Sequence, residues 1–437
     1  MVLCWFVDMT SSATIVLPLK QREVNSLPLH IQGSFPPAQA LSSEQADAVA
    51  RLTRAVLSVR PLVDVLEHPV FVASLGADQF SREHEVVLER LLNRIAACCS
   101  APEFKVLGAD CDAQLTPFER IVGNRLRDCG PYRPALLESN LDLPAVDSII
   151  QSTIRENFDR KFNSTEIRSF DGAVLKAYTA GNPIDPAIVI IPACGVPAKL
   201  CELWINFLSV DHFVLVWETR GLFGELTDVD SLGWDTRAQV KDLLAVMDHY
   251  GVSTGHVMGI CGGAVVALIA AHDSPERISS LSVWYGDFEL GSAAPKTMYQ
   301  QNLKEVMHLS GAGRSGAAAT HELFCSAMIN NMRADLAHLI IYPYATPELL
   351  FRYGRLNGSI MSTNVETLLE AIPQRTLVVT SQDDSSAHPA GSRHVALRLP
   401  NAMLHVKSHG DHLSFYEATA DLVELVLRFL GTCGPSV

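Results

Sequence analysis

The chain has 437 residues, of which 48% are hydrophobic and 19% are charged, and its formal net charge is −14. This length and apolar content predict a large core and two or more domains, and the acidic balance argues against a surface for nucleic acid or anionic membranes. The longest apolar runs, Ala187–Ala198 and Gly262–Ala271, are too short to span a bilayer.

Cysteine usage and the first residues indicate a reducing compartment. Ten cysteines are scattered along the chain, no Cys-x-x-Cys motif occurs, and Cys98-Cys99 lacks zinc-finger spacing. This pattern is not that of a disulfide framework. The first ten residues lack a basic region and include Asp8, which is not typical of a secretory signal. We therefore expect a cytoplasmic protein.

Residues 1–163 predict a mainly helical N-terminal domain. Ser42 and Gln45 form a capping-box pattern before an apolar stripe with helical spacing. A second stripe follows Ser81, and Thr116-Pro117-Phe118-Glu119 is a strong helix-start signal. Such stripes are typical of packing faces, so we assign this domain no chemistry. We expect it to serve in docking, in homodimer formation or in shaping substrate access.

From residue 164 the pattern changes to strands that alternate with helices. Two short runs flank Asp171-Gly172, the strongest short hairpin signal. Ala187–Ile191 and Phe213–Trp217 are continuous apolar strands, whereas Arg237–Tyr250 has the period of an amphipathic helix. This alternation indicates a mainly parallel sheet covered by helices on both faces. Residues 164–289 are therefore predicted to be the first part of an α/β core.

Residues 290–370 interrupt this rhythm with helical segments and a cluster of tyrosines. An insertion of this kind between two strands is what a cap or lid would look like. The α/β pattern resumes in residues 371–437, with strands predicted at Thr376–Thr380 and Met403–Val406 and a final helix at about Leu413–Leu430. This segment is predicted to be the second part of the core.

The sharpest signal lies in Gly259-Ile260-Cys261-Gly262-Gly263, between an apolar run and an alanine-rich segment of helical length. Gly-x-Cys-x-Gly in this position is typical of a nucleophile elbow, a tight turn that holds its central residue in strained geometry. Glycine is required beside that residue because side chains would clash across the turn. The helix N-terminus then directs its positive end at the thiol, which favours a reactive thiolate. The alternative is a glycine-rich turn with a buried, inert cysteine.

Four features between residues 164 and 432 resemble the α/β-hydrolase superfamily, and they follow its chain order. They are the loop Pro192–Pro197 in the place of a His-Gly-x-Pro oxyanion loop, the segment Glu218-Thr219-Arg220-Gly221-Leu222-Phe223-Gly224 in the place of a D-x-R-G-x-G turn, the Cys261 elbow, and the acid and histidine of Gln382-Asp383-Asp384 and Gly410-Asp411-His412. The resemblance implies an α/β-hydrolase core with a helical cap. We recognise no family resemblance in the extra N-terminal domain.

The resemblance also implies a Cys-His-Asp triad. Cys261 is the predicted nucleophile, His412 the general base and Asp384 the acid that orients it. Asp383 is an alternative acid one position earlier. Asp287 is another, because thioesterase domains of polyketide and peptide assembly lines often keep their acid after the preceding strand.

The oxyanion hole is expected to consist of the backbone N–H groups of Val196 and Gly262. Cys194 stands where the family usually has histidine, so the loop is expected to differ in shape and to bring a second thiol near the elbow. Glu218 and Arg220 are expected to brace the end of the sheet rather than to bind substrate.

These roles favour acyl transfer or hydrolysis through an acyl-Cys261 intermediate, on a thioester bound to CoA or to an acyl carrier protein, or on an ester or lactone. The Cys elbow also resembles dienelactone hydrolases and amino-acid N-acyltransferases of the bile-acid type, so water and amines both stay open as acceptors. A role in secondary-metabolite biosynthesis would fit the extra domain. No metal or organic cofactor is implied.

Two other functions stay open from the sequence. One is an elimination or C–C bond-cleaving enzyme on the same fold, in which His412 acts as a base on the substrate. The other is a non-catalytic binding or scaffold protein on a degenerate hydrolase fold, in which the Cys261 thiol would have ordinary reactivity.

Overall fold

The computed structural model describes residues 41–73, 82–108, 111, 114–128, 143–224, 229–328 and 335–431. The chain divides into a unit Met1–Gln39 and a compact unit Ala40–Val437. All described residues belong to the second unit, so the first 40 residues of the predicted N-terminal domain lie outside the description. The boundary predicted at residue 163 coincides with the start of strand β3, Asn163–Arg168.

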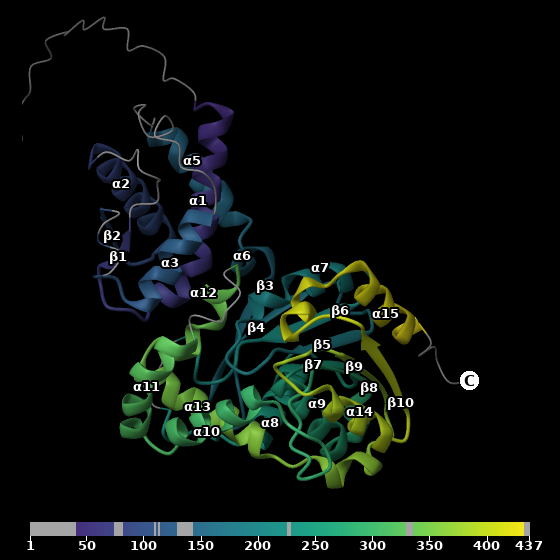
Figure 1. Cartoon of the computed structure of the whole chain (residues 1–437). Helices are drawn as coiled ribbons and strands as arrows, with labels where there is room; N and C mark the ends of the chain where they lie inside the picture. Colours follow the sequence, from purple (N-terminus) through teal and green to yellow (C-terminus); the bar gives the residue numbers. More distant parts are fainter. Residues whose placement is uncertain are drawn as a thin grey trace, which may run out of the picture. The chain divides into compact units, whose positions relative to one another are not determined.

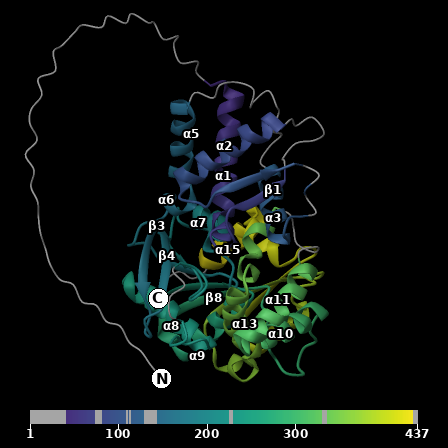
Figure 2. The same cartoon turned by 90° about the vertical axis from the view of Figure 1, so that its left-hand side faces the viewer.

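The described part of residues 41–163 is mainly helical, as predicted (Figure 1). Its helices are α1 (Ser43–Val63), α2 (Arg82–Cys99), α3 (Pro117–Asp128), α5 (Leu143–Arg155) and α6 (Phe158–Lys161). The predicted capping box of Ser42 and Gln45 begins α1, and α1 packs beside α5 (Figure 2). Two strands, β1 (Val70–Ala73) and β2 (Phe104–Leu107), pair in parallel. The sequence did not indicate them, because four residues carry too little alternation to be recognised.

An eight-stranded sheet forms the centre of the remaining chain, in the order β10-β9-β8-β7-β5-β6-β4-β3. After β3, its strands are β4 (Val174–Ala180), β5 (Ala187–Ile191), β6 (Phe213–Trp217), β7 (Gly255–Ile260), β8 (Ile278–Trp284), β9 (Arg375–Ser381) and β10 (Ala402–Lys407). Within this sheet, β4 pairs antiparallel with both of its neighbours and the other pairs are parallel. The predicted hairpin at Asp171-Gly172 joins β3 to β4, and Gly172 has a φ of 88°. The mainly parallel sheet is therefore confirmed.

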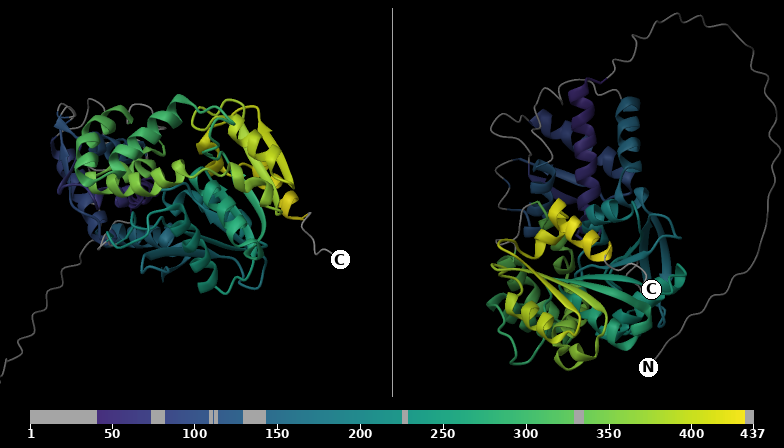
Figure 3. Two further views of the ribbon diagram at one scale, coloured as in Figure 1. Left: turned by 90° about the horizontal axis from the view of Figure 1, so that it is seen from below. Right: turned by 90° about the vertical axis from the view of Figure 1, so that its right-hand side faces the viewer.

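Different helices cover the two faces of the sheet (Figure 3). One face packs against α8 (Thr236–His249), α9 (Gly262–Asp273) and α14 (Pro389–Arg398), and the other against α7 (Glu202–Leu208) and α15 (Ala420–Gly431). Strand β5 separates the two apolar clusters, since Val189 and Ile191 belong to the first and Ile188 and Ile190 to the second. Successive strand residues point to opposite faces, which is why a strand buried on both sides is continuously apolar.

The predicted cap is helical and lies in the sequence between β8 and β9. It comprises α10 (Met298–Gly311), α11 (Arg314–Met328), α12 (Ala337–Ile340) and α13 (Pro347–Ser362). Helices α10 and α13 cross closely at two glycines, because a Cβ on Gly311 would lie 2.7 Å from the backbone of Gly354. Among the described residues, no helix combines the length and the hydropathy needed to cross a bilayer.

A buried cation fixes the end of β6, as the sequence predicted. Arg220 is 1% exposed and bonds to Asp242 and Asp171, each at 2.6 Å. The neighbouring Glu218 is also buried and accepts the N–H of Ala198 at 2.9 Å. Breaking such a buried pair leaves an uncompensated charge and costs about 3–5 kcal/mol. Glu218 therefore holds the turn after β6 against the segment after β5, and Arg220 holds it against the β3–β4 hairpin and helix α8.

Glu218 gives the protein a predictable pH dependence. Burial raises its pKa from 4.5 to about 8, although the Ala198 N–H opposes this. Between these values the folded state keeps a proton that the unfolded chain has released, so stability should fall as the pH rises from 4.5 to 8. We expect the denaturation midpoint to fall between pH 5.5 and pH 9 in the wild type, and to fall less over the same range in Glu218→Gln. The surface variant Glu276→Gln is the control and should behave as the wild type does. An equal fall of the midpoint in Glu218→Gln and in the wild type would contradict the prediction.

Candidate active site

Cys261 occupies the tight turn between β7 and α9. Its φ is 54° and its ψ is −117°, a backbone conformation that residues with side chains rarely adopt. A Cβ on Gly259 would lie 2.3 Å from the carbonyl oxygen of Gly263, and a Cβ on Gly263 would lie 2.4 Å from that of Ile191. Backbone segments approach so closely here that only glycine fits at both positions. The thiol is half-buried, and α9 begins directly after it at Gly262.

The close approach at the elbow predicts a large loss of stability in Gly259→Ala. We expect its free energy of unfolding to fall by about 3 kcal/mol or more, because backbone rather than a flexible side chain must move. Gly358→Ala in α13 is the matched control, since its Cβ would meet Met307 at an ordinary 3.5 Å and alanine favours a helix by about 1 kcal/mol. Chemical denaturation compares the two, and equal stabilities would contradict this account of the turn.

His412 and Asp384 are held together by the loops that follow β10 and β9. The Nδ1 atom of His412 lies 3.2 Å from Oδ2 of Asp384. The other carboxylate oxygen of Asp384 accepts the backbone N–H groups of Ser386 at 2.8 Å and Ala387 at 3.2 Å. The Asp384 side chain is fully buried and His412 is 16% exposed. The carboxylate is therefore fixed in place and fixes the imidazole in turn.

The charges at this site favour a protonated imidazole. Burial disfavours the charge on His412, but the negative charge of Cys261 and hydrogen bonds to Asp384 and Cys261 outweigh it. The pKa of His412 is therefore raised well above its ordinary value. Cys261, His412 and Asp384 thus form a continuous chain of interactions.

The two alternative acids have other partners. Asp383 is half-exposed and lies 3.0 Å from Nδ1 of His409. Asp287 is buried and accepts hydrogen bonds from Lys296 at 3.2 Å and from Gln300. Of the three acids considered, Asp384 is the one that the structure brings within hydrogen-bonding distance of His412.

The loop after β5 differs from the expected oxyanion loop. The N–H of Val196 donates to the carbonyl of Ala193 at 3.0 Å, because the chain turns sharply at Gly195, whose φ is 76°. The N–H of Val196, which was predicted to be an oxyanion donor, therefore already has an acceptor and can serve an oxyanion only if this bond opens or is shared. The backbone N–H of Gly262 can still donate to an oxyanion as predicted, because the first N–H groups of a helix lack an acceptor within the helix.

The second thiol of this loop lies near the first. Cys194 is buried and lines the same cavity as Cys261, and burial together with the charge of Cys261 raises the pKa of Cys194. Gly195 is held by its N–H, which donates to Thr219 at 3.1 Å. A Cβ on Gly195 would also meet the ring of Tyr353 at 3.0 Å. The loop is thus wedged between the turn after β6 and the cap.

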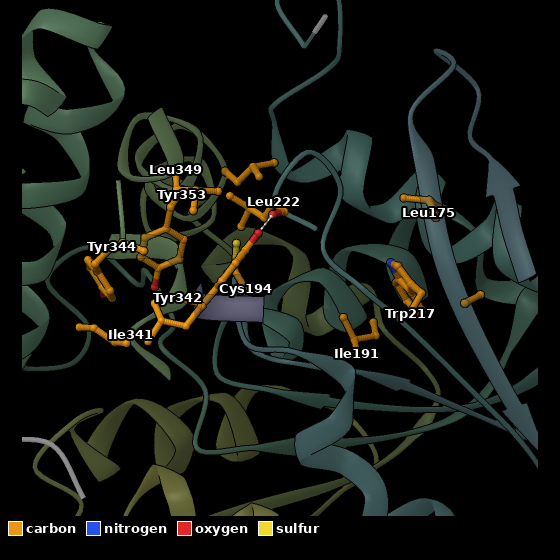
Figure 4. Packing of buried hydrophobic residues seen from close by; sticks show 14 of the residues in the cluster. Leu175, Ile191, Cys194, Trp217, Leu222, Ile341, Tyr342, Tyr344, Leu349 and Tyr353 are labelled. Carbon is orange, nitrogen blue, oxygen red and sulfur yellow. Dashed lines mark hydrogen bonds between the residues drawn. The ribbon is translucent and has the colours of Figure 1, made fainter. Parts of the chain in front are cut away.

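A cavity of about 510 Å³ adjoins the triad. Its wall contains Cys261 and His412 together with cap residues, which are Tyr299, Leu303, Ile340, Pro343, Tyr344, Tyr353 and Asn357. Figure 4 shows Cys194 next to the cap residues Tyr342, Tyr344 and Tyr353, and it marks the hydrogen bond of 2.6 Å from the Tyr342 hydroxyl to the carbonyl of Leu222. A mostly apolar pocket of this size is typical of small-molecule sites.

Asn357 and Leu303 are among the lining residues that were not predicted from the sequence. Asn357 donates to the hydroxyl of Tyr353 at 3.2 Å and so places a buried amide in the cavity wall. Leu303 contributes a side chain from α10. Both lie in ordinary helical patterns, and only the packing of the cap against the core brings them to the elbow. The spacing of residues along one helix does not predict which of them will reach the Cys261 elbow.

Comparisons with known proteins support the fold. No family model matches the chain. RutD of Pseudomonas savastanoi pv. phaseolicola, to which carbamate hydrolysis is ascribed, is 26% identical over 254 residues, which are 56% of this chain and 93% of RutD. A poly(3-hydroxyalkanoate) depolymerase of Ectopseudomonas oleovorans is 23% identical over 262 residues, which are 59% of this chain and 89% of that protein.

Solved structures are similar over the same extent. An α/β hydrolase from a Medee basin deep-sea metagenome library superposes with a TM-score of 0.50 and 20% identity, covering 62% of this chain and 98% of its own. A thermophilic esterase from Thermogutta terrifontis gives a TM-score of 0.50 and 18% identity, covering 62% and 100%. The chain therefore has the α/β-hydrolase fold, with an extra N-terminal region outside that similarity.

Proposed function

We propose that the protein is an α/β-hydrolase-fold enzyme that transfers or hydrolyses an acyl group through an acyl-Cys261 intermediate. The observation that carries the proposal is the interaction chain from the half-buried thiol through His412 to the buried Asp384, next to a cavity of about 510 Å³. The two relatives named above, a carbamate hydrolase and a depolymerase, agree with a bond-cleaving enzyme.

In the proposed reaction, the Cys261 sulfur attacks the acyl carbon and forms a tetrahedral intermediate. The N–H of Gly262 donates to the developing oxyanion. The imidazolium of His412 gives its proton to the leaving group, and the C–S or C–O bond of the substrate breaks. In the second half, His412 takes a proton from water or an amine as that acceptor attacks the acyl-thioester, which releases the product and restores the thiolate.

The proposed substrate is a thioester on CoA or a carrier protein. Exchange of one thioester for another is nearly balanced in free energy, so a cysteine nucleophile can take an acyl group from a thiol carrier without a large thermodynamic cost. The apolar and aromatic cavity wall suits an acyl chain or an aromatic acyl group. Localisation in the cytoplasm, where such carriers occur, and a carrier-docking or dimerising role for residues 1–163 belong to the same proposal.

The test compares matched substrates that share one acyl group. We expect kcat/KM for an acyl-thioester to exceed that for the corresponding oxygen ester by at least about tenfold, because the thiolate leaving group is the weaker base. Addition of amines at increasing concentration then separates hydrolysis from transfer, as the ratio of amide to free acid. No turnover of thioesters, combined with turnover of an ester by Cys261→Ala, would overturn the proposal.

A further inference from the structure

A second cavity, of about 370 Å³, is lined in part by helix α12, and we call it the α12 cavity. It is lined by residues of α1, α3 and α5, by residues near Lys199 after the oxyanion loop, and by α12 itself. None of its lining residues belongs to the triad. Five of them carry side-chain nitrogen donors, namely Arg54, Arg125, Asn157, Lys199 and His338.

His338 is the unusual member of this set. Its side chain is 3% exposed, and among the described residues neither ring nitrogen has a hydrogen-bond partner. Burial and the nearby positive charges of Arg125 and Lys199 lower its pKa to about 3. A buried polar group without a partner destabilises the fold, so a neutral imidazole held in this position requires an explanation. A ligand that accepts its N–H would supply one.

Within the described part of the chain, the cations beside His338 retain donors that no residue uses. The Nε of Arg125 donates to the Ser58 hydroxyl at 3.2 Å, and this bond uses one of five guanidinium N–H groups. Lys199 is largely buried, and this desolvation lowers its pKa, although Glu202 and Asp159 oppose the change. An ammonium group taken out of water is favoured when an anion lies against it.

The acidic residues of the cavity offset only part of this charge. Glu202 pairs with Lys161 at 3.0 Å, and Glu156 pairs with Arg54 at 3.7 Å on the exposed side. Asp335 is the third acid of the lining, and its charge raises the pKa of His338 against the larger effects described above. Two of the three acids that line the cavity with Arg125, Lys199 and the neutral imidazole are therefore already paired with other cations.

We propose that the α12 cavity binds the phosphate group of a phosphate ester, held by Arg125, Lys199 and His338. A phosphate offers enough oxygens for a guanidinium fork, an ammonium group and an imidazole N–H at once, whereas a carboxylate offers two. The volume of about 370 Å³ leaves room for an organic portion, within the usual range for ligand pockets. This inference does not depend on acyl transfer at Cys261.

The α12 cavity lies close to the catalytic cavity through two shared elements. Helix α12 places His338 in the former and Ile340 in the lining of the latter. Lys199 follows the oxyanion loop by two residues and belongs to the 3-10 helix Ala198–Cys201. A phosphate bound to both His338 and Lys199 in the α12 cavity would therefore hold the oxyanion loop and one wall of the catalytic cavity in fixed positions.

The test measures binding to the full chain at constant ionic strength, with inorganic phosphate, CoA and phosphate-free pantetheine as probes. We expect CoA to bind more tightly than inorganic phosphate. We also expect Arg125→Ala and Lys199→Met each to weaken phosphate and CoA by at least tenfold. Arg127→Ala, an exposed position on the same helix α3, is the matched control and should bind as the wild type does.

Three results would overturn the proposal. The first is no binding of phosphate or CoA beyond that of chloride. The second is equal loss in Arg125→Ala and Arg127→Ala, which would indicate nonspecific charge. The third is CoA binding no tighter than inorganic phosphate, which would make free phosphate the ligand. As a separate readout, the NMR-detected pKa of His338 should rise on binding phosphate, and an unchanged value would contradict contact with the imidazole.

Discussion

Replacing Cys261 by alanine is expected to lower kcat by about 10⁴-fold or more, with folding unchanged. The size follows from the loss of the covalent route, since removing the nucleophile of a triad removes the contribution of the whole group. The fold should tolerate the change, because the thiol is half-buried and alanine keeps the Cβ at the strained φ of 54°. Steady-state kinetics with a thioester, alongside circular dichroism and denaturation, measures both parts.

A matched control separates this role from that of the second thiol. Cys194→Ala removes the buried neighbour that lines the same cavity, and we expect it to change kcat by less than about tenfold, because Cys194 has no place in the triad. If Cys194→Ala lost as much activity as Cys261→Ala, or if Cys261→Ala kept a tenth of the wild-type rate, the nucleophile would be wrongly assigned.

Replacing Asp384 by asparagine is expected to lower kcat by about 10²–10⁴-fold. The amide keeps the shape of the side chain and an oxygen for the N–H groups of Ser386 and Ala387. It does not stabilise the imidazolium, whose raised pKa in His412 depends partly on Asp384. The alkaline limb of the pH–rate profile should therefore move to lower pH than in the wild type. The reason is that the His412 imidazolium, with a lower pKa, loses its proton at a lower pH.

Asp287→Asn is the control for this second prediction. Asp287 is bonded to Lys296 and Gln300 rather than to His412, so we expect its loss to change kcat by less than about tenfold. A larger effect at Asp287 than at Asp384 would mean that the acid lies after β8, as in the alternative weighed from the sequence, and that the cap loops rearrange around substrate.

Much of the fold was predictable because it depends on local patterns. Strand β5 is apolar throughout since both of its faces are buried. The elbow at Cys261 was recognisable because the clash distances at Gly259 and Gly263 allow no other residue. The resemblance to the α/β-hydrolase superfamily then placed Asp384 and His412 after two strands, β9 and β10, which are neighbours in the sheet.

The remaining features depend on contacts between distant segments. The hydrogen bond from Val196 to Ala193 closes a turn that the residue types alone do not specify. Asn357 and Leu303 reach the catalytic cavity only because the cap folds back over the elbow. His338 resembles any helical histidine in sequence, and its lack of hydrogen-bond partners among the described residues becomes visible only when α1, α3 and α12 are packed together.

The central claim is the acyl-cysteine, and intact-protein mass after brief exposure to a panel of acyl-thioesters tests it most directly. The wild type should gain the mass of one acyl group, and Cys261→Ala should gain none. His412→Ala should gain it more slowly, because the thiolate loses its imidazolium partner. An adduct of equal size and rate on Cys261→Ala, or no adduct on the wild type with any donor that it turns over, would contradict covalent catalysis at Cys261.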